Sequence, residues 1–240
     1  MTTRTMRWRH LQLPRPGVNP PTVLAALLVA CWIAVAATGG PPAWEATYAA
    51  LGLSWDGVSS GRVWQLLTHA LLHAGTPHLV GNVLLIYLLG GRVAVFLGGR
   101  AFLGIFAFGS LVGALVHLLL PPLWVPEPVL VGASGGGMAL LVAFATLSPD
   151  SRMWPLPVRA SNLGLGVMLA ALLLALLQAA LGWGWLPARW HALGDAPGIS
   201  ELLRVGHGYH FGGGLAGWLA ARRVLRRPPD LAALRRSRRG

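Results

Sequence analysis

Six long apolar stretches constrain this chain more than any other feature. They cover residues 22–38, 78–97, 101–120, 133–148, 161–182 and 207–222. A helix needs about 20 apolar residues to cross about 30 Å of hydrocarbon. Of the 240 residues, 55% are hydrophobic and only 11% are charged. The stretches predict an all-α membrane protein whose six transmembrane helices form one bundle over residues 22–222, and the composition excludes a soluble globular domain.

The charges are unevenly distributed about these stretches. Six spans place both termini on one side of the membrane, and all but three of the 19 arginines fall on that side. Many of them lie in a basic N-terminal segment, 1–21, and in an Arg-rich tail, 223–240. Such a bias marks the cytoplasmic side. We therefore expect cytoplasmic termini, and the tail needs no nucleic-acid partner because the lipid bilayer can attract its charge.

The loops between the spans differ in character. The first, 39–77, contains an amphipathic run from Val63 to His73 that we expect to lie in the membrane interface. The segment Arg92 to Arg100 is predicted to be a tight cytoplasmic turn. Prolines before Ser134 predict a non-helical segment that dips into the protein. The loop 183–206 carries tryptophans that fit either a lid over a site or simple interfacial anchoring.

Four polar residues lie where a membrane span should be apolar, and such residues usually mark function. They are His78 and Asn82 in the second stretch, Ser134 in the fourth and His210 in the sixth. Counting about 1.5 Å per residue from the nearest cytoplasmic charge places all four at a similar depth, in the outer half of the membrane. His78 and Asn82 are four residues apart and share a helix face. The four residues are therefore expected to form one site.

The residue types indicate acyl-transfer chemistry. A serine hydroxyl becomes a nucleophile when a neighbouring histidine takes its proton. An amide side chain, a second histidine and a backbone N–H at a helix start can hold the oxyanion that develops. No acidic residue lies at this depth to orient the imidazole, so Ser134 and His210 predict a dyad rather than a triad.

These residues sit in motifs that occur in order along the chain. Trp64-Gln-Leu-Leu-Thr-His-Ala-Leu-Leu-His73 is followed by His78-Leu-Val-Gly-Asn82, Gly132-Ala-Ser-Gly135, and His210-Phe-Gly-Gly213 with Gly217. Together they resemble the rhomboid family of intramembrane serine proteases.

The resemblance implies a six-helix core and cleavage of the transmembrane segments of membrane-protein substrates. Ser134 would be the nucleophile and His210 the base, while His78, Asn82 and the Ser134 amide would hold the oxyanion. No cofactor and no metal are expected. We expect a multi-pass protein of a bacterial inner (plasma) membrane.

Three positions depart from the family pattern. Gln65 follows Trp64 where the family carries arginine, Ala94 stands where it usually carries an acid, and Met138 replaces a frequent aromatic four residues after the serine. We expect these changes to affect loop rigidity, stability and packing against His210, and hence rate, but not the dyad.

Alternatives remain from the sequence alone. A rhomboid-like protein could bind transmembrane helices without cutting them, and a histidine-lined protein could transport metal ions or protons. His69 and His73 with His78 could form a metal site, although hydrogen bonding within the first loop is the favoured interpretation. His207, one turn before His210, could contact water or substrate. The oligomeric state is left open.

Overall fold

A computed structural model describes residues 19–120, 129–153, 157–182 and 205–226. The elements within these ranges are helices: α1 (Pro20–Ala36), α2 (Pro41–Leu51), α3 (Trp55–Ser59), α4 (Gln65–Thr68), the 3₁₀ turn η1 (His69–Leu71), α5 (Thr76–Leu85), the π-helical turn η2 (Ile86–Gly90), α6 (Gly91–Leu97), α7 (Gly99–Leu119), α8 (Ser134–Leu147), α9 (Ala160–Gly182) and α12 (His207–Leu225). The predicted lid and most of the predicted N-terminal segment and tail lie outside the described residues.

The all-helical prediction is confirmed, and each predicted span coincides with helix. The second is continuous helix made of α5, η2 and α6. Among the described residues, three helical stretches are long and apolar enough to cross a membrane: Thr76–Leu97, Gly99–Leu119 and Ala160–Leu181. The helices α1 and α8 are apolar but shorter. The crossing of all six helices and the side of the termini stay predictions.

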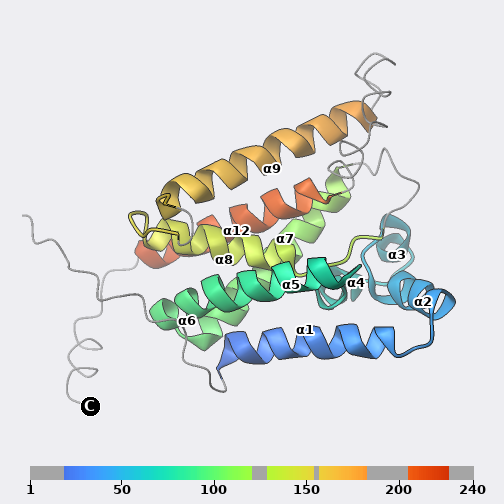
Figure 1. Ribbon diagram of the computed structural model, residues 1–240. Coiled ribbons are helices and arrows are strands. Elements are labelled where there is room, and N and C mark those ends of the chain that lie inside the picture. Colours follow the sequence, from blue (N-terminus) through green and yellow to red (C-terminus); the bar gives the residue numbers. More distant parts are fainter. Residues whose placement is uncertain (1–18, 121–128, 154–156, 183–204, 227–240) are drawn as a thin grey trace, which may run out of the picture.

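The long helices lie side by side, with α8 in the middle of the bundle (Figure 1). Ten of its 14 residues are buried. The helix α12 packs most extensively against α8 and α7. The short helices α2, α3 and α4 gather at one end of the bundle, and this is the end at which α8 and α12 begin (Figure 1).

Glycines let the central helices approach closely. A Cβ atom added to Gly213 would meet the backbone of Gly135, and one added to Gly217 would meet the backbone of Ala139. Across the other interface, a Cβ on Gly109 would meet the Ala139 side chain. Small residues four apart, as Gly109 and Gly113 and as Gly213 and Gly217, let helix backbones approach closely, and these contacts hold the central helices together.

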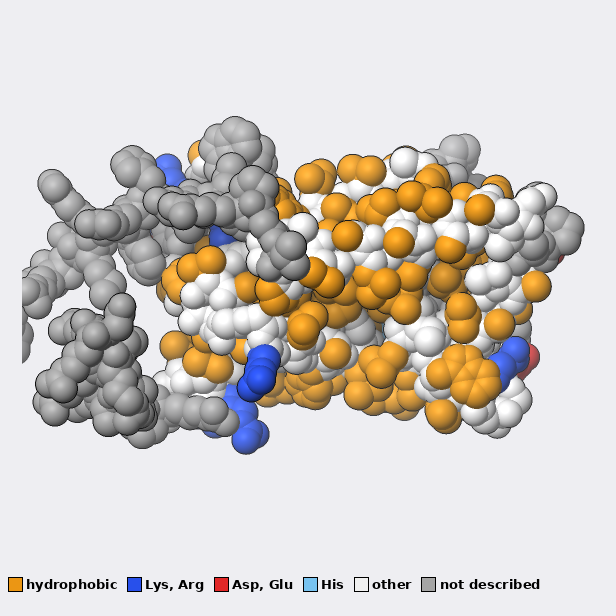
Figure 2. All heavy atoms as spheres, turned by 90° about the horizontal axis from the view of Figure 1, so that it is seen from below, with side chains coloured by type: hydrophobic (Ala, Val, Ile, Leu, Met, Phe, Trp, Pro, Cys, Tyr) orange, Lys and Arg blue, Asp and Glu red, His pale blue; other side chains and the backbone are white. Residues whose placement is uncertain are grey.

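The outside of the bundle is apolar. Figure 2 shows one face that is hydrophobic across its middle, with arginine visible only toward its two ends. Val95 and Leu119 are each 77% exposed. A large apolar surface on a monomer marks contact with membrane or protein.

In the first loop polar side chains are buried and apolar side chains are exposed, which is the reverse of the arrangement in a soluble protein. Gln65, His69 and His73 are at most 1% exposed, whereas Trp64 and Leu67 are at least half exposed. Polar side chains therefore face the protein and apolar ones face outward, as expected for a segment in the membrane interface.

The turn predicted over Arg92 to Arg100 is wrong in extent. The helix α6 continues to Leu97, and the chain reverses at Gly98, whose φ of 85° favours glycine. Arg92 lies within the helix, with its guanidinium 5.3 Å from the centre of the Phe144 ring. A long arginine stem can pack on apolar surface in this way, so the charge did not mark the helix end.

Candidate active site

Ser134 is the first residue of α8, and hydrogen bonds fix the segment before it. The Gly132 N–H donates to the carbonyl of His69 at 2.9 Å, and its carbonyl accepts from the Tyr209 hydroxyl at 3.0 Å. The φ of Gly132 is 124°, and a Cβ there would stand 2.6 Å from Cε1 of His78. Glycine is therefore required at position 132 for two reasons: its φ is positive, and a Cβ would clash with the His78 ring.

His210 lies in the first turn of α12, opposite Ser134. Its Nε2 is 2.8 Å from the Ser134 Oγ, within hydrogen-bond distance. Both side chains are partly buried, so each keeps some access for a substrate. The geometry is that of a nucleophile beside its base.

The distance between α8 and α12 depends on the close contact of Gly213 with Gly135. Gly213 follows His210 by one helical turn, and Gly135 follows Ser134 directly. Two glycines therefore sit beside the two reactive side chains. Any larger residue at Gly213 would move His210 relative to Ser134.

Carboxylates are absent from this site within the described ranges. The acidic residues described there are Glu45, Asp56 and Asp150, and all three are exposed. Asp150 pairs with Arg159 at 3.6 Å. The imidazole of His210 has no acidic partner among them, in keeping with a dyad.

The side chains of His78 and Asn82 on α5 lie next to Gly132, in the segment that precedes Ser134. A Cβ on Gly132 would stand 2.7 Å from the His78 Nε2 and 3.7 Å from the Asn82 Nδ2. Asn82 is 4% exposed, and no hydrogen bond to its Nδ2 is present within the described part of the chain. A buried amide donor without a partner is costly unless it serves a bound group.

The start of α8 supplies further donors. The first N–H groups of a helix have no carbonyl partner within it and carry a partial positive charge. The Ser134 amide is one of these groups. The four residues predicted from the sequence therefore converge, with backbone donors beside them.

Two residues near the site have roles that the sequence did not indicate. Tyr209 is fully buried, donates to Gly132, and packs its ring at 5.1 Å from that of His69. Gln65 accepts from the Ser54 N–H at 3.3 Å and donates to the Ala49 carbonyl at 2.9 Å. In the sequence, Tyr209 could be recognised only as an aromatic residue next to His210. Gln65 stood out as a departure from the family motif, not as a hydrogen-bonding centre.

The other histidines near the site make hydrogen bonds or edge-to-face ring contacts. The His69 Nδ1 is 2.7 Å from the Gln65 carbonyl, so this nitrogen donates. The His73 ring lies 5.2 Å from that of His78, and that of His207 lies 6.2 Å from that of His210. Burial lowers the pKa of His69 and that of His73 to about 4. No group of three potential metal ligands is found within the described residues.

Comparison with known proteins agrees with this architecture. A helical membrane bundle with a serine and a histidine at hydrogen-bond distance defines a candidate serine hydrolase of the membrane. The model of the Rhomboid domain matches residues 60–227. The chain therefore belongs to the rhomboid family, which includes intramembrane serine proteases.

Two curated relatives match part of the chain. The protein named "Putative rhomboid protease YdcA" of Bacillus subtilis is 38% identical over 79 residues, which are 33% of this chain and 38% of that protein. "Rhomboid-related protein 2" of Mus musculus is 36% identical over 78 residues, which are 32% of this chain and 24% of that protein. The aligned part thus spans well under half of each relative.

Proposed function

We propose that this protein is an intramembrane serine endopeptidase that cleaves the transmembrane segments of membrane proteins. The observation that carries the proposal is the 2.8 Å approach of the His210 Nε2 to the Ser134 Oγ. Membership in the rhomboid family supports it. The rhomboid-like bundle would have six spans and cytoplasmic termini, in a bacterial inner membrane.

In the proposed reaction, the Ser134 Oγ attacks the carbonyl carbon of the scissile peptide bond while His210 Nε2 takes the hydroxyl proton. The carbonyl oxygen becomes an oxyanion. It would accept hydrogen bonds from the Asn82 Nδ2, the His78 ring and the Ser134 N–H. Removing one such donor typically costs 10²–10³-fold in rate.

The tetrahedral intermediate then collapses. The C–N bond breaks, His210 gives its proton to the leaving amine, and the acyl group remains as an ester on Ser134. His210 next takes a proton from water, whose oxygen attacks the ester, and returns it to the Ser134 Oγ. The partly buried site would receive water from the end of the bundle at which α8 and α12 begin.

A rhomboid-like protein that binds helices without cutting is the competing hypothesis. The free Asn82 donor and the Ser134–His210 hydrogen bond favour the protease, since a binding protein needs neither. A metal or proton transporter predicts flux that survives Ser134→Ala.

A fluorophosphonate probe tests the proposal. The wild type should gain the mass of one probe less HF on the peptide containing Ser134, because the Oγ–P bond forms as the P–F bond breaks, and Ser134→Ala should gain none. Ser148→Ala, at the other end of the same helix, should label like the wild type. Unlabelled wild-type protein beside a labelled serine protease would sink the protease proposal.

A further inference from the structure

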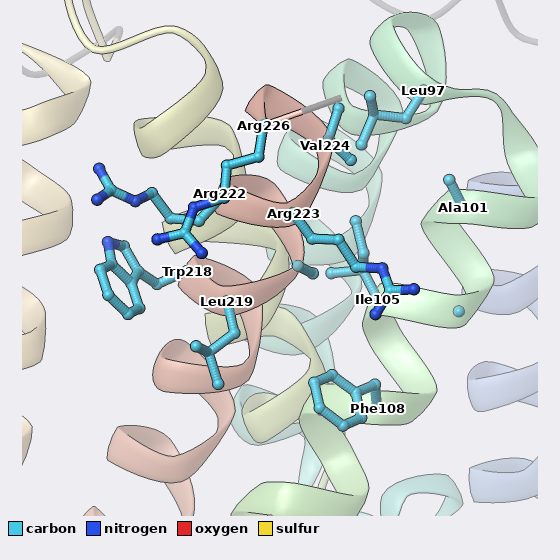
Figure 3. A pocket seen from close by; sticks show the side chains of 12 residues that line it. Leu97, Ala101, Ile105, Phe108, Trp218, Leu219, Arg222, Arg223, Val224 and Arg226 are labelled. Carbon is cyan, nitrogen blue, oxygen red and sulfur yellow. The ribbon is translucent and has the colours of Figure 1, made fainter. Parts of the chain in front are cut away.

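A groove of about 800 Å³ lies between α7 and α12 (Figure 3), and neither Ser134 nor His210 is among the residues that line it. It is formed by the first half of α7 and the last turns of α12. His210 precedes Arg222 by twelve residues, which is about 18 Å along a helix. The groove is therefore near the opposite end of the bundle from the candidate active site.

The walls of the groove are apolar. Ile105 and Phe108 of α7 face Leu219 of α12 across it, and Trp218 lies at its side (Figure 3). Phe108, Trp218 and Leu219 are each more than 40% exposed. Such walls suit a hydrocarbon chain and offer little to a fully hydrated ligand.

Three arginines line the same groove, and none of the acidic residues that the structure describes does. They are Arg222, Arg223 and Arg226, all exposed. Arg223 extends from α12 toward Ile105 of α7, across the groove (Figure 3). Arg222 lies over the Trp218 ring at 5.3 Å. Within the described residues none of the three forms an ion pair, so their donors can meet an anion.

We propose that this groove binds one anionic glycerophospholipid, with its phosphate at the arginines and an acyl chain along the apolar walls. Guanidinium groups match phosphate oxygens in charge and geometry. Basic pockets between membrane helices suit anionic headgroups, and the predicted topology places this end at the cytoplasmic leaflet, where such lipids raise the negative surface potential. The proposal does not depend on the proposed catalysis, so Ser134→Ala should bind the lipid like the wild type.

Native mass spectrometry of the full chain in detergent tests the charge requirement. The probes are phosphatidylglycerol, phosphatidylcholine with the same chains, and glycerol phosphate. The wild type should retain one phosphatidylglycerol. The triple variant Arg222→Gln/Arg223→Gln/Arg226→Gln should bind it roughly 100-fold more weakly, since three arginines at on the order of 1 kcal/mol each contribute about 3 kcal/mol.

A matched control separates the groove from overall charge. Arg152 and Arg159 are also exposed and do not line the groove, so changing both to Gln removes two charges elsewhere. This control should bind phosphatidylglycerol within about twofold of the wild type. If it loses as much binding as the double groove variant Arg223→Gln/Arg226→Gln, the groove is not a site and the proposal fails.

A second pair of variants tests the acyl chain. Gly104 lines the groove, and a Cβ there would meet nothing within 4 Å. Gly104→Leu should therefore fill the groove without a clash and weaken lipid binding at unchanged charge. Gly166 on α9 also has nothing within 4 Å of an added Cβ, and Gly166→Leu should leave lipid binding unchanged.

The remaining outcomes decide against the proposal. Equal binding of phosphatidylcholine would show a nonspecific apolar surface, and equal binding of glycerol phosphate would show a plain phosphate site. A change in the fraction of dimer instead of lipid retention would show that the groove receives a second copy of the chain.

Discussion

Replacing Gly213 with alanine should inactivate the protein more than it unfolds it. A Cβ there would stand 2.7 Å from the carbonyl carbon of Gly135 and 2.8 Å from its Cα. Real Cβ atoms essentially never come within 3.0 Å of such atoms, and ordinary contact begins at 3.4 Å. The blocking atoms are backbone, so α12 must shift by about 0.6 Å or more relative to α8.

That shift acts directly on the dyad. His210 is one turn from Gly213, and its hydrogen bond to Ser134 is 2.8 Å long, so the same displacement would take it to the limit of a hydrogen bond. A misplacement near 1 Å can cost about 10²-fold in rate, and we expect a 10- to 100-fold loss of reporter cleavage. Overpacking should also lower the free energy of unfolding by about 1–3 kcal/mol.

The assay is cleavage of a single-span reporter in liposomes, with thermal unfolding measured in detergent. Gly81→Ala is the matched control, because Gly81 adjoins Asn82 and yet a Cβ there would meet nothing within 4 Å. It should cut at the wild-type rate. Equal rates for Gly213→Ala and Gly81→Ala would refute the claim that this glycine contact sets the distance within the dyad.

Three further predictions concern the oxyanion site and the first loop. Asn82→Ala should reduce reporter cleavage by about 10²–10³-fold without unfolding the protein, because it removes a donor that has no partner in the described fold. Gln65→Leu should lower the free energy of unfolding in detergent by about 1–3 kcal/mol, because the Ala49 carbonyl and the Ser54 N–H lose their partner. The third concerns pH: burial lowers the pKa of His69 from 6.5 to about 4. As the pH is lowered, His69 is protonated in the unfolded chain near pH 6.5 but in the folded protein only near pH 4. The free energy of unfolding should therefore fall as the pH is lowered from 6.5 to 4, by up to about 3 kcal/mol.

Controls make each of these decisive. Asn162→Ala, at an exposed position of α9, should leave cleavage unchanged, and an Asn82→Ala rate within twofold of the wild type would exclude an oxyanion role. Gln178→Leu removes an exposed hydrogen bond to the Val205 carbonyl and should lower the free energy of unfolding less than Gln65→Leu does. His69→Asn should reduce the pH dependence of stability, while His73, whose pKa burial also lowers to about 4, still contributes its part. An unchanged slope would mean that other groups cause it.

Much of the fold could be predicted because the membrane leaves few choices. A helix satisfies its own backbone hydrogen bonds inside a membrane, and each of the six predicted stretches coincides with helix. Arg92 misled the prediction, since its charge suggested a helix end while the residue lies within α6 with its guanidinium over the Phe144 ring.

The positions of the candidate site residues also followed from the sequence. His78, Asn82, Ser134 and His210 were polar in apolar surroundings at one depth, and the structure brings them together. Tyr209 could not be assigned in the same way, because its role depends on a hydrogen bond to Gly132, 77 residues away along the chain. Such partners are set by tertiary packing and leave no local pattern.

The packing around His210 illustrates the same limit. Met138 replaces an aromatic of the family pattern, which predicted looser packing. In the structure Met138 packs against the hydrophobic core, and the aromatic contacts of His210 come from Tyr209 and His207 within its own helix.

Cleavage of single-span reporters in liposomes tests the central claim most directly, with wild type, Ser134→Ala, His210→Ala and Ser148→Ala compared at equal protein amounts. In the proposed mechanism Ser134 and His210 act as one unit, so each of their variants should lose essentially all cleavage. Ser148→Ala and the wild type should cut alike. Cleavage by Ser134→Ala or His210→Ala at the wild-type rate would contradict the proposed dyad.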